Sequence, residues 1–216
     1  MSEFTRQKLL EVAEKLIAKN GIGNTSLRQI VKEAGVNIAA VNYHFGSKDD
    51  LMIAVYQQHF IPVNDERIRR LDNLEAQAEG KAIELEELLD AFMMPVFEGK
   101  LRDKEKRAHN VQLFSRLHTE GLELRMKIFS SFSHVLIRFV QAFSKILPNL
   151  TPAEIFFRMK CSMGILMTLA MEPPFPKHTM PLQTELEPEQ LAASLIAYAS
   201  AGFRSYPDPK PNQGDK

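Results

Sequence analysis

The sequence predicts an all-α protein, with an N-terminal three-helix head and a larger helical body. Apolar residues recur at three- and four-residue spacing along most of the chain, which is the pattern of amphipathic helices. No segment combines alternating apolar residues with the turn residues that bound hairpin strands. A length of 216 residues is enough for a small head and a body with its own apolar core.

The first predicted helix ends at Asn20 and Gly21. Its apolar stripe consists of Leu9, Leu10, Val12, Ala13, Leu16 and Ile17. The segment lacks the basic stretch followed by an apolar run that marks a secretion signal, so we interpret it as part of the folded protein.

The next two predicted helices form a helix–turn–helix pair. The apolar stripe of the first consists of Leu27, Ile30, Val31 and Ala34. Thr25 or Ser26 is expected to cap it, because a hydroxyl accepts hydrogen bonds from the free amides of the first turn. Gly35 tolerates the positive φ that a sharp turn requires, and Asn37 is expected to cap the following helix.

The second helix of this pair is expected to bury Val41 and Phe45, which share one face. Ala39, Ala40 and Tyr43 are then expected on the opposite face. Alanine there would let the helix approach base edges and touch a thymine methyl group. Gly46 ends this helix, and the next begins with a capping-box-like arrangement that starts at Ser47.

The stretch from Phe4 to roughly Tyr56 resembles the DNA-binding domain of TetR-family transcriptional regulators. The resemblance rests on four motifs in the correct order: T-S-L-R-Q-I, A-G-V, N-Y-H-F and G-S-K-D-D-L. It implies a DNA-binding head (residues 1–48) and a ligand-binding and dimerisation body (residues 49–205). The tail, residues 206–216, has little apolar content and is predicted to be disordered. The implied function is a homodimeric, ligand-responsive repressor of a palindromic operator on double-stranded DNA.

The predicted DNA contacts lie in the helix–turn–helix and the turn that follows. Arg28 is expected to contact a base edge. Lys48 lies in the first turn of a helix, where a cation opposes the helix dipole, so we expect that it is present there to contact a phosphate. Asn37 could either cap its helix or contact DNA. The full set is Ser26, Arg28, Asn37, Ile38, Ala39, Ala40, Asn42, Tyr43, His44 and Lys48. Tyr43 and His44 are expected to contact phosphates near the end of the second helix of the pair, although His44 could instead pack against the turn.

The net charge of zero does not exclude a nucleic-acid partner, because the charges are unevenly distributed. Residues 1–48 contain seven Lys and Arg against four Glu, whereas residues 72–90 contain seven acids against Lys81. DNA affinity should therefore fall steeply with salt.

Further helices are predicted from Ser47 to about Phe60 and then over 64–79, 83–97, 103–118, 121–147, 152–171 and 188–204. Pro62 is expected to break or kink the chain, and Pro95 to kink its helix. Residues 172–188 are proline-rich and are predicted to form a loop.

Met and Phe side chains are frequent in the body. Most are expected in the core, and as a group they could line a pocket for a small, mainly apolar effector. The candidate pocket residues are Phe92, Met93, Phe97, Phe114, Phe132, Met163 and Met167. The resemblance implies that the last two long helices dimerise, with Met159, Met163, Leu166, Ala170, Leu191, Leu195 and Tyr198 as candidate contacts. Packing within the subunit is the alternative.

An enzyme is the main competing class, and a helical adaptor is a third. His118, Glu120 and Glu123 could be drawn as an acid–base cluster, but no nucleophile elbow, phosphate-binding loop or metal-ligand spacing accompanies them. Cys161, the only cysteine, is expected to be a buried, unreactive thiol. We therefore expect no catalytic residues, metal or cofactor. No apolar run reaches the roughly 18 residues of a membrane span, and we expect a cytoplasmic protein.

Overall fold

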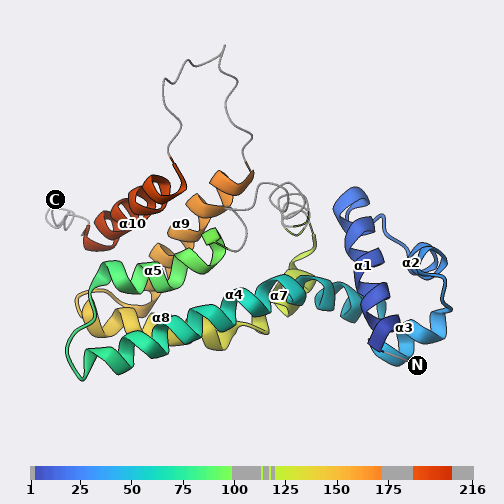
Figure 1. The fold of residues 1–216 in the computed structure, drawn as a ribbon, viewed down its shortest axis with the longest axis horizontal. Helices are drawn as coiled ribbons and strands as arrows, with labels where there is room; N and C mark the ends of the chain where they lie inside the picture. Colours follow the sequence, from blue (N-terminus) through green and yellow to red (C-terminus); the bar gives the residue numbers. More distant parts are fainter. Residues whose placement is uncertain (1–2, 99–112, 114–116, 118–119, 172–186, 206–216) are drawn as a thin grey trace, which may run out of the picture.

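The computed structural model describes residues 3–98, 113, 117, 120–171 and 187–205 (Figure 1). All regular structure in these ranges is helical, which confirms the predicted fold class. The helices are α1 (Glu3–Asn20), α2 (Leu27–Ala34), α3 (Ile38–His44), α4 (Lys48–Ala78), α5 (Leu85–Val96), α7 (Leu122–Ser130), α8 (Ser133–Ile146), α9 (Pro152–Met171) and α10 (Pro188–Arg204). No helix in the described part of the chain is long and apolar enough to cross a membrane.

The head lies at one end of an elongated molecule, and α4 runs from it into the body (Figure 1). Helices α1 to α3 and the first half of α4 surround one apolar cluster, here called the head cluster. Its fully buried members include Leu9, Ile30, Val41, Leu51 and Tyr56.

The turns of the head follow the predicted caps. Ser26 Oγ accepts from Gln29 N at 3.2 Å, and Gln29 Oε1 accepts from Ser26 N at 2.9 Å, so two free amides of α2 are satisfied. Gly35 has a φ of 67° and ends α2. Asn37 Oδ1 accepts from Ala40 N at 3.0 Å, which caps α3. Ser47 caps α4 in the same way.

A break or a kink was predicted at Pro62; a break is wrong, because α4 is one helix of 31 residues that contains this proline. Proline removes one backbone donor, but the helix is held on both sides of this point by burial. Leu51 and Val55 lie in the head cluster, and Val63 and Leu71 lie in a second apolar cluster, here called the body cluster. The predicted domain division after residue 48 therefore falls at the start of a helix that packs into both clusters.

The predicted single helix over 121–147 is also wrong, because it is divided into α7 and α8 at Ser131 and Phe132. Ser131 Oγ donates to Ile128 O at 2.6 Å, and Ser130 Oγ donates to Lys127 O at 3.0 Å. Such local bonds compete with the helix for its carbonyls. Phe132 packs instead on Phe60, with ring centroids 5.1 Å apart.

The body consists of α5, α8, α9, α10 and the second half of α4 around the body cluster. Aromatic rings dominate its centre: the centroids of Phe92 and Phe139 are 5.1 Å apart, and those of Phe143 and Phe203 are 4.8 Å apart. Helices α9 and α10 have the predicted bounds, and α5 contains Pro95. The predicted helix over 103–118 lies outside the described residues apart from positions 113 and 117, as do the loop up to residue 186 and the tail.

Candidate nucleic-acid interface

The outer face of α3 consists of exposed side chains at helical spacing: Ile38, Ala39, Asn42 and Tyr43. Tyr43 is 69% exposed and Ile38 is 43% exposed, although both are large and apolar enough to be buried in a core. The opposite face is fixed in the head cluster by Val41. The cap at Asn37 and the buried face thus hold a mostly apolar surface toward solvent.

The predicted outward position of Ala40 is wrong. Its side chain is only 1% exposed and belongs to the head cluster. In a helix, residue 40 lies about 100° from each neighbour, on the same flank as Val41. Ala40 is therefore excluded from direct contact with a ligand of this surface, whereas Ala39 is exposed.

Two predicted contact residues lie on or before α2. Arg28 is exposed in its first turn. Ser26 is exposed as well, but its hydroxyl already takes part in the capping box and donates to Gln29 Oε1 at 2.9 Å. The carboxamide of Asn37 is likewise engaged by its capping bond. A DNA contact from either cap stays a prediction.

Lys48 lies against the loop between α1 and α2. Its Nζ donates to Ile22 O at 3.3 Å, and Ile22 N donates to Glu120 Oε1 at 3.2 Å. A backbone carbonyl is a neutral acceptor, so this bond orients the ammonium group without neutralising it. The predicted phosphate contact of Lys48 is not tested by this geometry.

His44 is half-buried between two aromatic rings. Its ring meets Tyr43 edge-on at 5.0 Å and lies 6.2 Å from Phe45. Within the described ranges its Nε2 is buried without a hydrogen-bond partner. The packed alternative thus describes the ring well, and the predicted phosphate role remains open.

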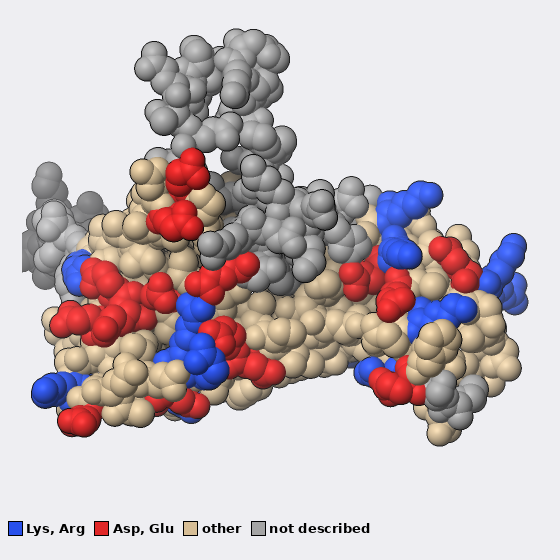
Figure 2. Space-filling model, viewed as in Figure 1, with Lys and Arg blue, Asp and Glu red and all other residues tan. Residues whose placement is uncertain are grey.

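Charge is distributed unevenly over the molecule. In the view of Figure 2, blue Lys and Arg side chains project at several places from the head, with red carboxylates between them. Acidic side chains gather at the other end, over the body. Association of the head with a polyanion is therefore not opposed by the overall neutrality of the chain.

Comparison with known proteins gives two family matches. Residues 90–202 match the model described as "Tetracyclin repressor-like, C-terminal domain", and residues 9–55 match "Bacterial regulatory proteins, tetR family". The first match covers more than half of the chain.

The chain belongs to the TetR family. This TetR-family regulator is 39% identical over 56 residues to the HTH-type transcriptional regulator AcrR of Shigella flexneri. The aligned segment is 26% of each chain. It is 34% identical over 68 residues, or 37% of the relative, to the regulator SAUSA300_2515 of Staphylococcus aureus. The curated relatives are thus matched over little more than a third of their length at most.

Solved structures cover nearly the whole chain at lower identity. NalD of Pseudomonas aeruginosa, described as the secondary repressor of the MexAB-OprM multidrug efflux pump, is 22% identical with a TM-score of 0.62, covering 94% of this chain and 98% of NalD. A TerR/AcrR-family regulator from Aquifex aeolicus is 20% identical with a TM-score of 0.52, covering 92% and 99%. These similarities show that the fold is shared.

The family assignment confirms that the TetR-family protein is a regulator and not an enzyme. The residues considered for catalysis have ordinary roles where they are described. Glu120 accepts from Ile22 N, and Glu123 pairs with Lys127 at 2.9 Å. His118 lies outside the described residues. The expected burial of Cys161 is wrong, because this residue is exposed on α9.

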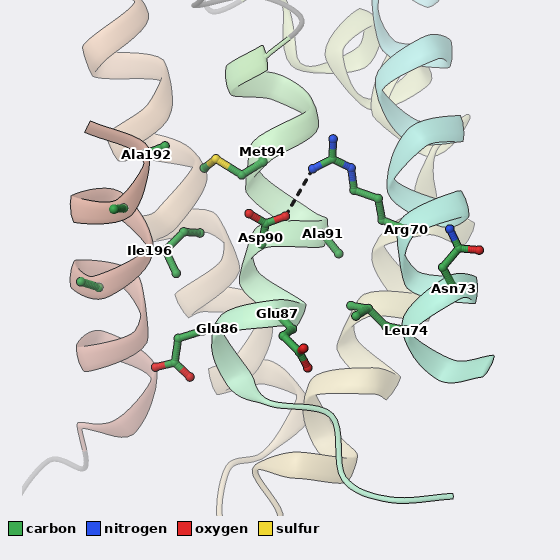
Figure 3. Close-up of a pocket in the computed structure, with 12 residues that line it drawn as sticks. Arg70, Asn73, Leu74, Glu86, Glu87, Asp90, Ala91, Met94, Ala192 and Ile196 are labelled. Carbon is green, nitrogen blue, oxygen red and sulfur yellow. Dashed lines mark hydrogen bonds and ion pairs between the residues drawn. The ribbon is translucent and has the colours of Figure 1, made fainter. Parts of the chain in front are cut away.

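The candidate pocket residues do not form one group. Phe92, Met93 and Phe97 lie in the body cluster, with Met163 and Met167 packed against it, whereas Phe132 belongs to the head cluster and Phe114 lies outside the described residues. None of them lines the open groove between α4, α5 and α10, which has a volume of about 810 Å³ (Figure 3).

Arg70, Asp90 and Glu86 of that groove have partners of opposite charge. Arg70 binds Glu66 at 2.7 Å and Asp90 at 3.3 Å, and Figure 3 shows the latter pair across the groove. Arg204 Nη2 donates to Glu86 Oε2 at 2.9 Å. Hydrogen bonds from Arg69 and Arg70 lower the pKa of Glu66 to about 2, and those from Arg204 and Ser200 lower the pKa of Glu86 to about 2. The groove therefore offers no uncompensated charge at these residues.

The predicted dimer stripe is largely wrong, because it packs within the subunit. Met159, Leu166 and Leu195 are at most 5% exposed, and Met163 and Leu191 pack against the body cluster. The side chain of Ala170 lies outside the described set, and Tyr198 is exposed. Packing within the subunit, which was the alternative interpretation, accounts for the buried members of these stripes.

The opposite face of α9 and α10 is exposed and rich in apolar and small residues, and is here called the outer α9–α10 face. Phe157 is 65% exposed, Phe156 is 41% exposed and Tyr198 is 69% exposed. The remaining exposed members are Cys161, Gly164 and Ala201. The available signal was Phe157, which lies two residues from both Ile155 and Met159 and therefore on the side of α9 opposite these buried residues.

Proposed function

We propose that the protein represses transcription by binding a palindromic operator as a homodimer, and that a small, mainly apolar effector changes this binding. The observation that carries the proposal is the exposed outer face of α3, which is positioned by the caps at Ser26 and Asn37 within the matched family region. A short helix with exposed small and aromatic side chains is suited to the major groove.

Sequence readout is assigned to few side chains. Arg28 suits a bidentate contact to guanine, Asn42 suits adenine, and Ile38 with Ala39 suits thymine methyl groups. Because two of these contacts are apolar, DNA shape should contribute to the choice of operator. The polar groups around them, Ser26, Asn37, Tyr43, His44 and Lys48, are proposed to contact the DNA backbone.

The exposed outer α9–α10 face supports the proposed homodimer. Exposed aromatic side chains next to Gly164 and Ala201 would allow two helices to approach a second pair closely. A two-fold dimer would present two heads, which must sit about one helical turn of DNA apart, roughly 34 to 36 Å. This geometry requires a palindromic site.

The effector response is proposed to pass through α4 and the segment before α7. Tyr56 Oη donates to Leu113 O at 3.1 Å, and burial together with the charge of Glu120 raises the pKa of Tyr56 well above its usual value. Glu120 also holds Ile22 N in the head. Coupling between sites of this kind is typically about 1 to 3 kcal/mol.

Footprinting on the DNA upstream of the protein's own gene, combined with a salt titration, tests this proposal. We expect a protected palindrome and an affinity that falls steeply with salt. Binding that ignores both sequence and salt would refute it and would favour the helical adaptor.

A further inference from the structure

Arg67 is a buried cation in the middle of α4, with a relative exposure of 6%. Its Nε donates to Phe92 O at 2.7 Å, its Nη1 to Asn64 Oδ1 at 3.0 Å and its Nη2 to Met163 Sδ at 3.1 Å. The guanidinium carbon lies 4.5 Å from the centroid of the Phe92 ring. All of these partners are electrically neutral.

The other body arginines that reach carboxylates are more exposed. Arg70 pairs with Glu66 and Asp90, Arg138 pairs with Asp72 at 2.8 Å, and Arg204 pairs with Glu86. Arg67 has the opposite combination of deep burial and no carboxylate partner among the described residues.

This combination is energetically unfavourable for the protein alone. Removing an ion from water costs several kcal/mol, and a neutral carbonyl, amide and thioether replace only part of its hydration. The attraction between the guanidinium and the Phe92 ring offsets only part of this cost. Burial lowers the pKa of Arg67 to about 10, so the group remains charged at neutral pH.

The guanidinium also has spare hydrogen-bonding capacity. Three of its five N–H groups donate to the partners given above, which leaves two without an acceptor among the described residues. One of the three donates to the sulfur of Met163, and a thioether is a weak acceptor. Both terminal nitrogens can therefore donate to a stronger, negatively charged acceptor.

We propose that Arg67 anchors the carboxylate of an apolar effector molecule. The carboxylate binds Nη1 and Nη2 of Arg67 and replaces the sulfur of Met163, which forms a charge-assisted pair of hydrogen bonds. Met163 is half-buried, and its unbranched side chain readily adopts another rotamer to admit the ligand. The apolar part of the ligand takes the place of the Met163 side chain against the body cluster, in which Phe92 and Met93 are buried.

This proposal rests on the proposed effector response and specifies its chemistry. It assigns the site to α4, the helix that also packs into the head cluster. A neutral apolar molecule would bring no counter-charge to Arg67 and should bind less well than the acid of the same shape.

The test compares acids with their uncharged counterparts by thermal shift and titration calorimetry. The probes are sodium hexanoate, cyclohexanecarboxylate, benzoate, phenylacetate and 4-phenylbutyrate, each with its primary amide. We expect at least one carboxylate to raise the Tm of the full chain while its amide does not. Arg67→Met should weaken that binding by about 10- to 100-fold, the usual effect of losing a charged hydrogen-bonded partner.

Arg138→Met is the matched control, because it removes an arginine from the same body at a site with its own carboxylates. It should leave carboxylate binding unchanged. Met163→Ala retains Arg67 and frees Nη2, so it should bind the same carboxylate at least as tightly, and it keeps the test decisive if Arg67→Met folds poorly.

The proposal is overturned if no carboxylate in the panel stabilises the wild-type chain more than its amide, or if the stabilisation survives Arg67→Met. Neither result depends on DNA. A failure of the proposed function would instead appear as absent operator binding by the ligand-free protein.

Discussion

Replacing Phe157 by glutamate should dissociate the proposed dimer. About two thirds of this side chain is exposed in the subunit, since its relative exposure is 65%. Full burial of a phenylalanine side chain contributes roughly 1.5 to 3 kcal/mol, so the part left for an interface contributes about 1 to 2 kcal/mol. A two-fold interface contains the residue twice, which gives about 2 to 4 kcal/mol per dimer.

The dimer dissociation constant should therefore rise by about 30- to 1000-fold, before any penalty for burying the new charge. Sedimentation velocity over a concentration series measures this change, and circular dichroism checks that the subunit remains folded. Ile137→Glu is the matched control, because Ile137 is 55% exposed on α8, outside the outer α9–α10 face. An unchanged dissociation constant for Phe157→Glu, or equal dissociation in the control, would refute the assignment of the interface.

The remaining predictions concern the head, the body and the tail. Tyr43→Ala with Lys48→Ala should weaken binding to all DNA sequences alike and reduce the salt dependence, with helicity intact; an unchanged affinity in a low-salt titration would contradict their backbone roles. Glu86→Gln should lower Tm at neutral pH but not near pH 2, because the Arg204 bond lowers the pKa of Glu86 to about 2 from an ordinary 4.5, so its stabilisation is present above pH 4.5 and lost as the pH falls toward 2. An equal Tm loss at both pH values would show that the charge is not involved. Removing residues 206–216 should leave melting and DNA binding unaltered, and a clear drop in Tm would show that the tail docks.

The parts of the head that could be predicted depend on interactions between neighbours in sequence. The caps at Ser26 and Asn37 and the turn at Gly35 each involve a few consecutive residues, and their physics is visible in the letters. Ala40 could not be assigned in this way, because alanine fits equally well in a core and against a groove.

The errors in the body arise where packing decides. Pro62 was predicted to break or kink a helix by a local rule, but burial on both sides keeps α4 continuous. The stripes of α9 and α10 were assigned to a partner because periodicity shows which residues share a face and not what covers it. The burial of Arg67 could have been predicted from the sequence, because it lies four residues after Val63 and four residues before Leu71, on the same buried face of α4.

The continuity of α4 makes it a lever arm. Arg67 lies 19 residues from the first residue of this helix, which corresponds to about 29 Å at 1.5 Å per residue. A tilt of about 5° at that point would move the helix start by roughly 2.5 Å, and opposite tilts in two subunits would change the spacing of the heads by about 5 Å. The major grooves of DNA recur at a fixed interval, so such a displacement would place one head out of register with its half-site.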